Sequence, residues 1–176
     1  MIKFFTSALL FILLTMVEFG FVHGLPKPFL FTPLVFACGV YLYQHLGSPI
    51  GVWWIFVLGV FLDFWHLGLV PFESLVYAAA AFLMVFLGRH FFTNHSLYGV
   101  VANAVLTMFF IHFVHGVYLF FNSFGESLPL PWSSFFGFVL WQTVLLILLT
   151  SVLFFLARKI ELFLKGLLIV PTRESL

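Results

Sequence analysis

The chain has 176 residues, of which 64% are hydrophobic and 7% are charged, and its formal net charge is +1. A soluble domain is about a quarter charged because its surface faces water, so this composition excludes a soluble globule and predicts a membrane protein. The apolar runs are continuous rather than alternating, which excludes a transmembrane β-barrel and favours helices. The small net charge provides no electrostatic footprint for a nucleic-acid partner.

Six apolar segments approach the length of about 20 residues that an α-helix needs to cross a bilayer. We therefore expect an all-α, polytopic membrane protein whose residues 1–157 form a six-helix transmembrane bundle. The expected spans are 4–22, 29–43, 50–65, 72–87, 97–121 and 135–157. The first segment could instead be a secretory signal, but no small-residue cleavage site follows it, which favours a retained helix. Residues 158–176 are expected to form a cytoplasmic, amphipathic and basic tail.

The basic residues predict the orientation of this bundle, because the cytoplasmic loops of membrane proteins are rich in Lys and Arg. If the amino terminus is cytoplasmic and the chain crosses six times, only Lys27 lies outside. The basic residues then inside are Lys3, Arg89, Arg158, Lys159, Lys165 and Arg173. We therefore expect both termini in the cytoplasm.

Several ionisable side chains gather at the end of the bundle that this orientation places outside. Five of them are named here the outer polar cluster: Glu18, His66, Glu73, His112 and His115. One interpretation is that each is solvated at the interface or bonds a helix end, where charge is least costly in a membrane. The other is that they line a shared polar cavity that opens outward. The sequence favours the first interpretation, because it does not show that these helices face one another.

Residues that could support catalysis or bind metal are few. His112 and His115 lie one helical turn apart and could bind zinc with a nearby carboxylate, but this spacing alone is a weak signal and favours structural histidines. Asp63 and Glu73 could form an acid–base pair, although they lie on either side of a loop. The serine hydrolase elbow and the P-loop motif are both absent. We expect no catalytic residue, no metal and no cofactor.

A short pattern spans the end of the third segment and the start of the fourth: a Gly, an Asp four residues later, a turn with Gly and Pro, and a new apolar helix. Its residues are Gly59, Asp63, Gly68, Pro71 and Phe72. This pattern, the chain length and the helix count resemble the MreD family of rod shape-determining membrane proteins. Glu73 departs from the family pattern, in which a small residue, usually Gly, closes the turn. The turn is also a residue or two longer than usual.

The resemblance implies a non-enzymatic membrane scaffold of the bacterial cell-elongation complex, which directs side-wall peptidoglycan synthesis and cell shape. The implied location is the bacterial inner (cell) membrane. The implied partners are membrane lipid, a bitopic MreC-like protein and, through it, an MreB-like filament and the elongation synthase. Asp63 would then fix the turn, through backbone donors around Gly68 or through His66.

Small six-helix transporter subunits share a similar plan, so a second function stays open. The alternative is the substrate-binding membrane subunit of an energy-coupling-factor vitamin transporter. Such a subunit requires an outward pocket with ligand-selective polar groups. It also requires a first helix rich in Ala or Gly, and the first segment here has only a weak patch of small residues.

Overall fold

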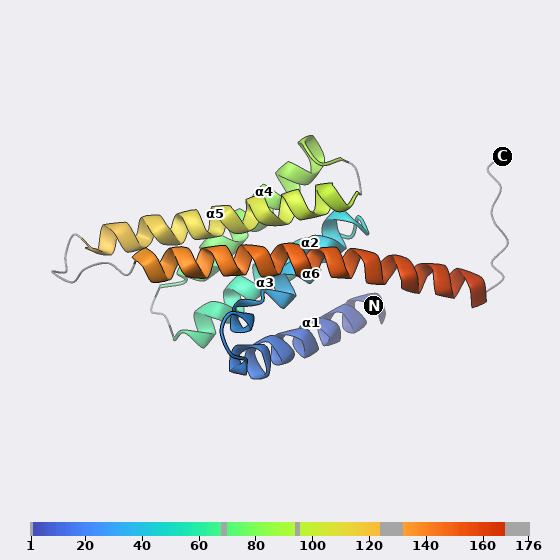
Figure 1. The fold of residues 1–176 in the computed structure, drawn as a ribbon, viewed down its shortest axis with the longest axis horizontal. Helices are drawn as coiled ribbons and strands as arrows, with labels where there is room; N and C mark the ends of the chain where they lie inside the picture. The colour runs from blue at the N-terminus through green and yellow to red at the C-terminus, as the bar shows by residue number, and fades with distance from the viewer. Residues whose placement is uncertain (1, 68–69, 94–95, 124–131, 168–176) are drawn as a thin grey trace.

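The structure is a computed structural model that describes residues 2–67, 70–93, 96–123 and 132–167. Over these residues the chain is helical and contains no strand (Figure 1). The α-helices are α1 (Ile2–Gly20), α2 (Leu34–Gln44), α3 (Ile50–Trp65), α4 (Phe72–His90), α5 (Leu97–Ser123) and α6 (Trp132–Leu167). Two short 3-10 helices, η1 (Val22–Gly24) and η2 (Phe29–Phe31), connect α1 to α2. The expected all-α membrane bundle is confirmed.

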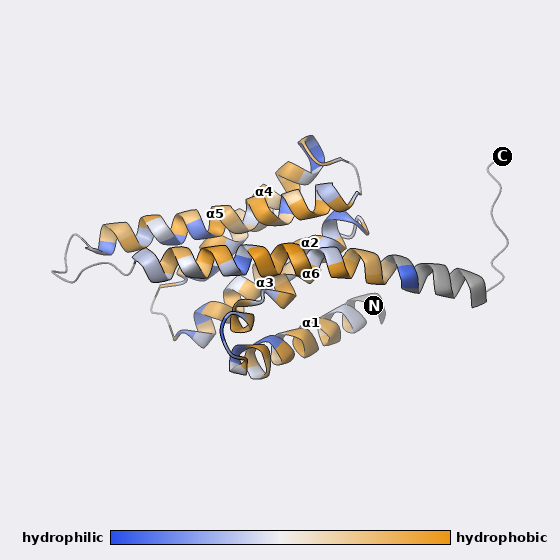
Figure 2. Cartoon of the chain, viewed as in Figure 1, coloured by the Kyte–Doolittle hydropathy of each residue, from blue (hydrophilic) through white to orange (hydrophobic). Residues whose placement is uncertain are grey.

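Four of the helical segments are long and apolar enough to cross a membrane: Phe5–Gly24, Phe72–His90, Leu97–Ser123 and Trp132–Ala157. α2 has 11 residues and α3 has 16, so they reach only about 16 and 24 Å at 1.5 Å per residue, against a hydrocarbon core of about 30 Å. The number of crossings therefore stays a prediction. Hydrophobic residues make up most of each helix (Figure 2), and many large ones are exposed, such as Phe82 on α4 at 76%.

Two helix boundaries differ from those expected by five residues or more. α2 begins at Leu34 rather than at Phe29, because Pro33 disfavours helical backbone at the residue before it and the preceding segment forms η2 instead. α6 does not end near Ala157 but continues to Leu167, because residues 158–165 contain no Pro or Gly to stop it. Residues 168–176 of the expected tail lie outside the described part of the chain.

The shortest α-helix, α2, lies at the centre of the bundle. Seven of its 11 residues are buried, and it contacts α1, α3, α5 and α6. Val35, Phe36 and Val40 pack in the core with residues of the surrounding helices, including Ile55, Met84, Met108 and Leu146. Because the longer helices surround α2, its short length is compatible with burial inside the membrane protein.

Consecutive helices run in opposite directions, so the start of α1 and the end of α6 lie at the same end of the bundle (Figure 1). At that end a buried amide network joins α2, α4 and α5. Asn103 Nδ2 donates to Gln44 Oε1 at 2.8 Å and to the Met84 carbonyl at 3.2 Å, and Thr107 Oγ1 donates to Asn103 Oδ1 at 3.2 Å. Each donor here has an acceptor, as buried polar groups in a membrane require. The opposite end of the bundle contains the candidate site.

Candidate functional site

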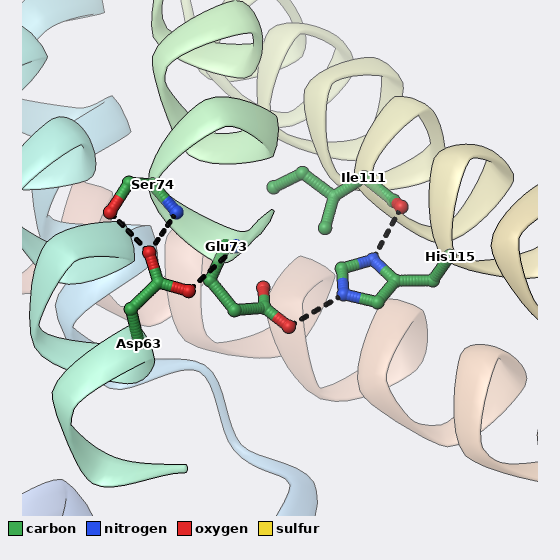
Figure 3. Close-up of polar contacts among 5 residues, drawn as sticks. All are labelled: Asp63, Glu73, Ser74, Ile111 and His115. Carbon is green, nitrogen blue, oxygen red and sulfur yellow. Dashed lines mark hydrogen bonds and ion pairs between the residues drawn. The ribbon is translucent and has the colours of Figure 1, made fainter. Parts of the chain in front are cut away.

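Asp63 caps the first turn of α4. The residue before that helix is Pro71, which supplies no side-chain cap, so the first amides of α4 need an acceptor from elsewhere. The Glu73 amide donates to Asp63 Oδ1 at 2.9 Å and the Ser74 amide donates to Oδ2 at 2.7 Å. The Ser74 hydroxyl also donates to Oδ2 (Figure 3). A carboxylate of α3 thus takes the place of a local cap.

The donors to Asp63 differ from those expected. The sequence placed them around Gly68 or at His66, whereas the structure places them on α4, beyond Pro71, at Glu73 and Ser74. The physical reason is that the first amides of a helix are aligned and unpaired, so they present two donors to one carboxylate. Gly68 lies outside the described residues.

Gly59 lies where α3 and α4 touch. A Cβ added at this position would lie 2.5 Å from Tyr77 Cβ and 2.8 Å from the Glu73 carbonyl oxygen. The absence of a side chain therefore admits the α4 backbone itself. One turn later the Asp63 cap binds the same helix, so Gly59 and Asp63 together fix α4 against α3. Phe72 instead contacts α5, with its ring against Tyr118 at a centroid distance of 4.6 Å.

Glu18 plays the same part for α2 that Asp63 plays for α4. Pro33 precedes α2 and supplies no side-chain cap, and the Val35 amide donates to Glu18 Oε2 at 2.7 Å. Glu18 belongs to α1 and is only 7% exposed. A carboxylate from the preceding α-helix therefore caps each of the two helices that begin after a proline at this end.

The carboxylate of Glu73 points away from Asp63 and toward α5 (Figure 3). Glu73 Oε1 lies 2.9 Å from His115 Nε2, while His115 Nδ1 lies 2.8 Å from the Ile111 carbonyl oxygen. A carbonyl oxygen only accepts, so Nδ1 carries a proton, and a second proton is shared between Nε2 and the carboxylate. The Glu73–His115 pair is therefore neutral as a unit. Asp63 and Glu73 do not form a carboxylate pair for acid–base chemistry.

A cavity of about 610 Å³, named here the end cavity, opens between these helices. All five members of the outer polar cluster line it. Both interpretations left open by the sequence have a counterpart here, since the five residues line one cavity while Glu18 also bonds the start of α2. Its wall also includes polar residues that the sequence reading did not single out: His23, Thr32 and Gln142. Its aromatic residues are Phe19, Phe31, Phe36, Trp65, Tyr77, Tyr118, Phe135 and Phe138.

Two buried polar atoms in the lining of the end cavity have no hydrogen-bond partner: His112 Nε2 on α5 and Gln142 Oε1 on α6. His112 is 6% exposed, and its ring meets Phe138 edge-on at 5.4 Å between centroids. Gln142 could have been noticed in the sequence as an amide in an otherwise apolar span, a type of residue that is often functional. Most buried polar groups are paired, so these two atoms require an explanation.

The end cavity does not present an assembled metal site. Over the described residues, no group of three or more His, Cys, Asp or Glu side chains converges as a metal would require. His112 and His115, the pair considered from the sequence, differ in their contacts, because both ring nitrogens of His115 already face acceptors. The arrangement can bind a molecule through hydrogen bonds and ring faces, but it does not supply a ligand set for zinc.

No family model, no curated protein and no solved structure matches this chain. The class of protein is therefore defined by the fold and the cavity alone. Over its described residues it is an all-α membrane protein in which six α-helices line an aromatic-walled cavity, with a few polar groups, at one end of the bundle.

Proposed function

We propose that this protein is a non-enzymatic membrane scaffold of the bacterial cell-elongation complex, located in the inner (cell) membrane and similar in role to MreD. In this role it binds a bitopic MreC-like protein and, through that protein, an MreB-like filament and the elongation synthase. The proposal starts from the resemblance over Gly59 to Phe72 and rests on what those residues do in the fold.

The observation that carries the proposal is the fixed α3–α4 pair. Gly59 admits the α4 backbone and Asp63 accepts two backbone hydrogen bonds from α4. Gly59 and Asp63, two of the residues that carry the family resemblance, are thus engaged in holding two helices together. A rigid helix pair of this kind suits a protein that presents a surface to other membrane helices.

The contacts of the carboxylates also support a role without catalysis. Asp63 is occupied by the amides of α4, and Glu73 is occupied by His115. A general base must lie within hydrogen-bond reach of the proton that it removes, and neither carboxylate is free to do so.

The second candidate function, the substrate-binding subunit of an energy-coupling-factor transporter, is favoured by one observation: the end cavity. Its volume falls within the range of about 300–1,000 Å³ that is usual for small-molecule sites. Against this function stands α1, whose exposed face has large residues such as Leu9 and Met16 rather than a stripe of small ones. We therefore place the scaffold first.

Affinity purification from the source membranes tests the proposal. The tagged chain is extracted in a mild detergent and the recovered proteins are quantified by mass spectrometry. We expect enrichment of a protein with a single transmembrane helix and a large domain outside the membrane. Recovery of paired cytoplasmic ATPase subunits instead would refute the scaffold and support the transporter subunit. Tagged Phe82→Ala, altered at an exposed α4 side chain away from the end cavity, tests whether the α4 surface contributes to recovery.

A further inference from the structure

We infer that the end cavity is a binding site for a small amine, with its ammonium group held by the polar wall and an aromatic or other apolar body held by the rings. This inference goes beyond the scaffold function and does not depend on it. The argument rests on the unpartnered atoms, the charges and the ring faces of the cavity.

The unpartnered atoms of the cavity are suited to a hydrogen-bond donor. Gln142 Oε1 is buried, has no partner and only accepts. His112 Nε2 is also buried and without a partner, and it accepts when the ring carries its proton on Nδ1. An unsatisfied buried polar atom costs about 1–3 kcal/mol. A ligand with N–H groups would satisfy both atoms, which lie on neighbouring helices, α5 and α6.

The charges around the cavity favour a cation over an anion. Among the described residues that line it there is no Lys and no Arg, whereas two are carboxylates, Glu18 and Glu73. Because His115 neutralises Glu73, Glu18 is the acidic side chain in the lining that no basic side chain pairs. An anionic ligand would meet no fixed positive charge, and its desolvation would not be compensated.

The rings of the cavity complete the site. Phe19, Trp65 and Tyr118 come from three different helices and all line it. The face of an aromatic ring attracts a cation by about 0.5–2 kcal/mol, and ring faces also pack against a flat apolar body. The lining thus combines an apolar wall with a small number of unpartnered acceptors, and a mainly apolar lining with a few polar groups is the usual character of a small-molecule site.

Three probes of similar size and different charge test the inference: phenethylamine, 2-phenylethanol and 3-phenylpropanoate. Binding to the purified full-length protein is measured by isothermal titration calorimetry in detergent, with protein-free micelles as the blank. We expect saturable binding of phenethylamine, with a Kd at least about tenfold lower than that of either other probe. No saturable binding, or binding of 3-phenylpropanoate as tight as that of the amine, would overturn the inference.

Variants locate the binding and separate charge from shape. Glu18→Gln keeps an acceptor for the Val35 amide but removes the carboxylate, so we expect the Kd for phenethylamine to rise at least about fivefold while that for 2-phenylethanol changes less than about twofold. Gln142→Leu should raise the Kd for phenethylamine by a similar factor. His90→Phe, altered at an exposed histidine on the far end of α4, is the control and should bind like the unaltered protein. Unchanged amine binding in both Glu18→Gln and Gln142→Leu would refute the site.

The ammonium group could belong to a soluble amine or to the ethanolamine headgroup of a lipid. The titration is therefore repeated in nanodiscs of phosphatidylethanolamine and in nanodiscs of phosphatidylglycerol. If the Kd of phenethylamine is higher in phosphatidylethanolamine nanodiscs than in phosphatidylglycerol nanodiscs, the lipid headgroup competes for the cavity and is the natural source of the ammonium group. If the two Kd values are equal, the natural ligand is a soluble amine. The binding measurements do not depend on which protein co-purifies, so the scaffold proposal and the amine-site inference can be refuted separately.

Discussion

Replacement of Asp63 by Ala tests the reasoning about the α3–α4 pair most directly. The change removes the acceptor of the Glu73 and Ser74 amides and of the Ser74 hydroxyl. Loss of an N-terminal cap costs about 0.5–2 kcal/mol, and an amide left without a partner costs about 1–3 kcal/mol when it is buried. Asp63 is only half-buried, so water replaces part of the lost bonding and we expect a loss of about 2 kcal/mol.

Thermal unfolding in detergent measures this loss. For a chain of this length, 1 kcal/mol shifts the melting temperature by about 2–4 °C, so Asp63→Ala should melt about 4–8 °C below the unaltered protein. Asp63→Asn should be milder because it retains one oxygen acceptor. Glu73→Gln is a matched control, since it leaves the Glu73 amide and hence the cap intact, although it alters the contact with His115.

A double-mutant cycle separates the cap from other effects of the substitution. Ser74→Ala removes only the hydroxyl donor. The decrease in the free energy of unfolding that this substitution causes should be smaller in the Asp63→Ala background than in the unaltered protein, because the acceptor is already absent. If Asp63→Ala and the unaltered protein melt at the same temperature, the carboxylate does not hold α4 and the structural interpretation is wrong. That result, combined with loss of partner recovery, would assign Asp63 a direct role in binding.

Three further predictions concern a close helix contact, the cap of α2 and the orientation in the membrane. Gly59→Ala places a Cβ 2.5 Å from Tyr77 Cβ and should destabilise the fold by about 1–3 kcal/mol. The control Gly137→Ala on α6 adds a Cβ that meets nothing within 4 Å and should stabilise the fold by about 0.5–1 kcal/mol. Equal melting temperatures of the two variants would refute the close contact. Glu18→Ala should lower the melting temperature by several degrees through loss of the α2 cap, while Glu18→Gln should not. In a background without the native cysteine, Lys27→Cys should react with an impermeant thiol reagent from outside intact cells and His90→Cys should not, and the reverse pattern would overturn the orientation.

The sequence predicted the helices well because membrane helices are visible as apolar runs. The six runs and their order agree with the structure, and α3 has the expected bounds. The centre of the bundle was not predictable, because α2 is no more apolar than its longer neighbours and hydropathy does not show which helix the others surround. The start of α2 was placed five residues early because residues 29–31 are apolar but lie before Pro33.

The candidate site was predictable in its members but not in its contacts. The positions of Glu18, Glu73 and His115 near helix ends indicated one end of the bundle, yet partners separated by 17 or 42 residues depend on how the helices are rotated. The proline before α2 and the proline before α4 were usable signals. A helix that begins after proline without Ser, Thr, Asp or Asn at its cap needs an acceptor from another element, and the nearest carboxylate that precedes each helix in the chain supplies it.

The polar residues that line the end cavity fall into two groups: those whose polar atoms have hydrogen-bond partners within the fold, and those that retain a buried atom without a partner. Glu18, Glu73 and His115 are polar groups in a membrane protein whose contacts serve the fold, since each bonds a helix start or a neighbouring helix. Their presence alone would not indicate a ligand. His112 and Gln142 differ because each retains a buried atom that no described group satisfies. In a lipid environment such an atom is costly, so it is these two residues, rather than the larger number of charged ones, that make the cavity a candidate for binding.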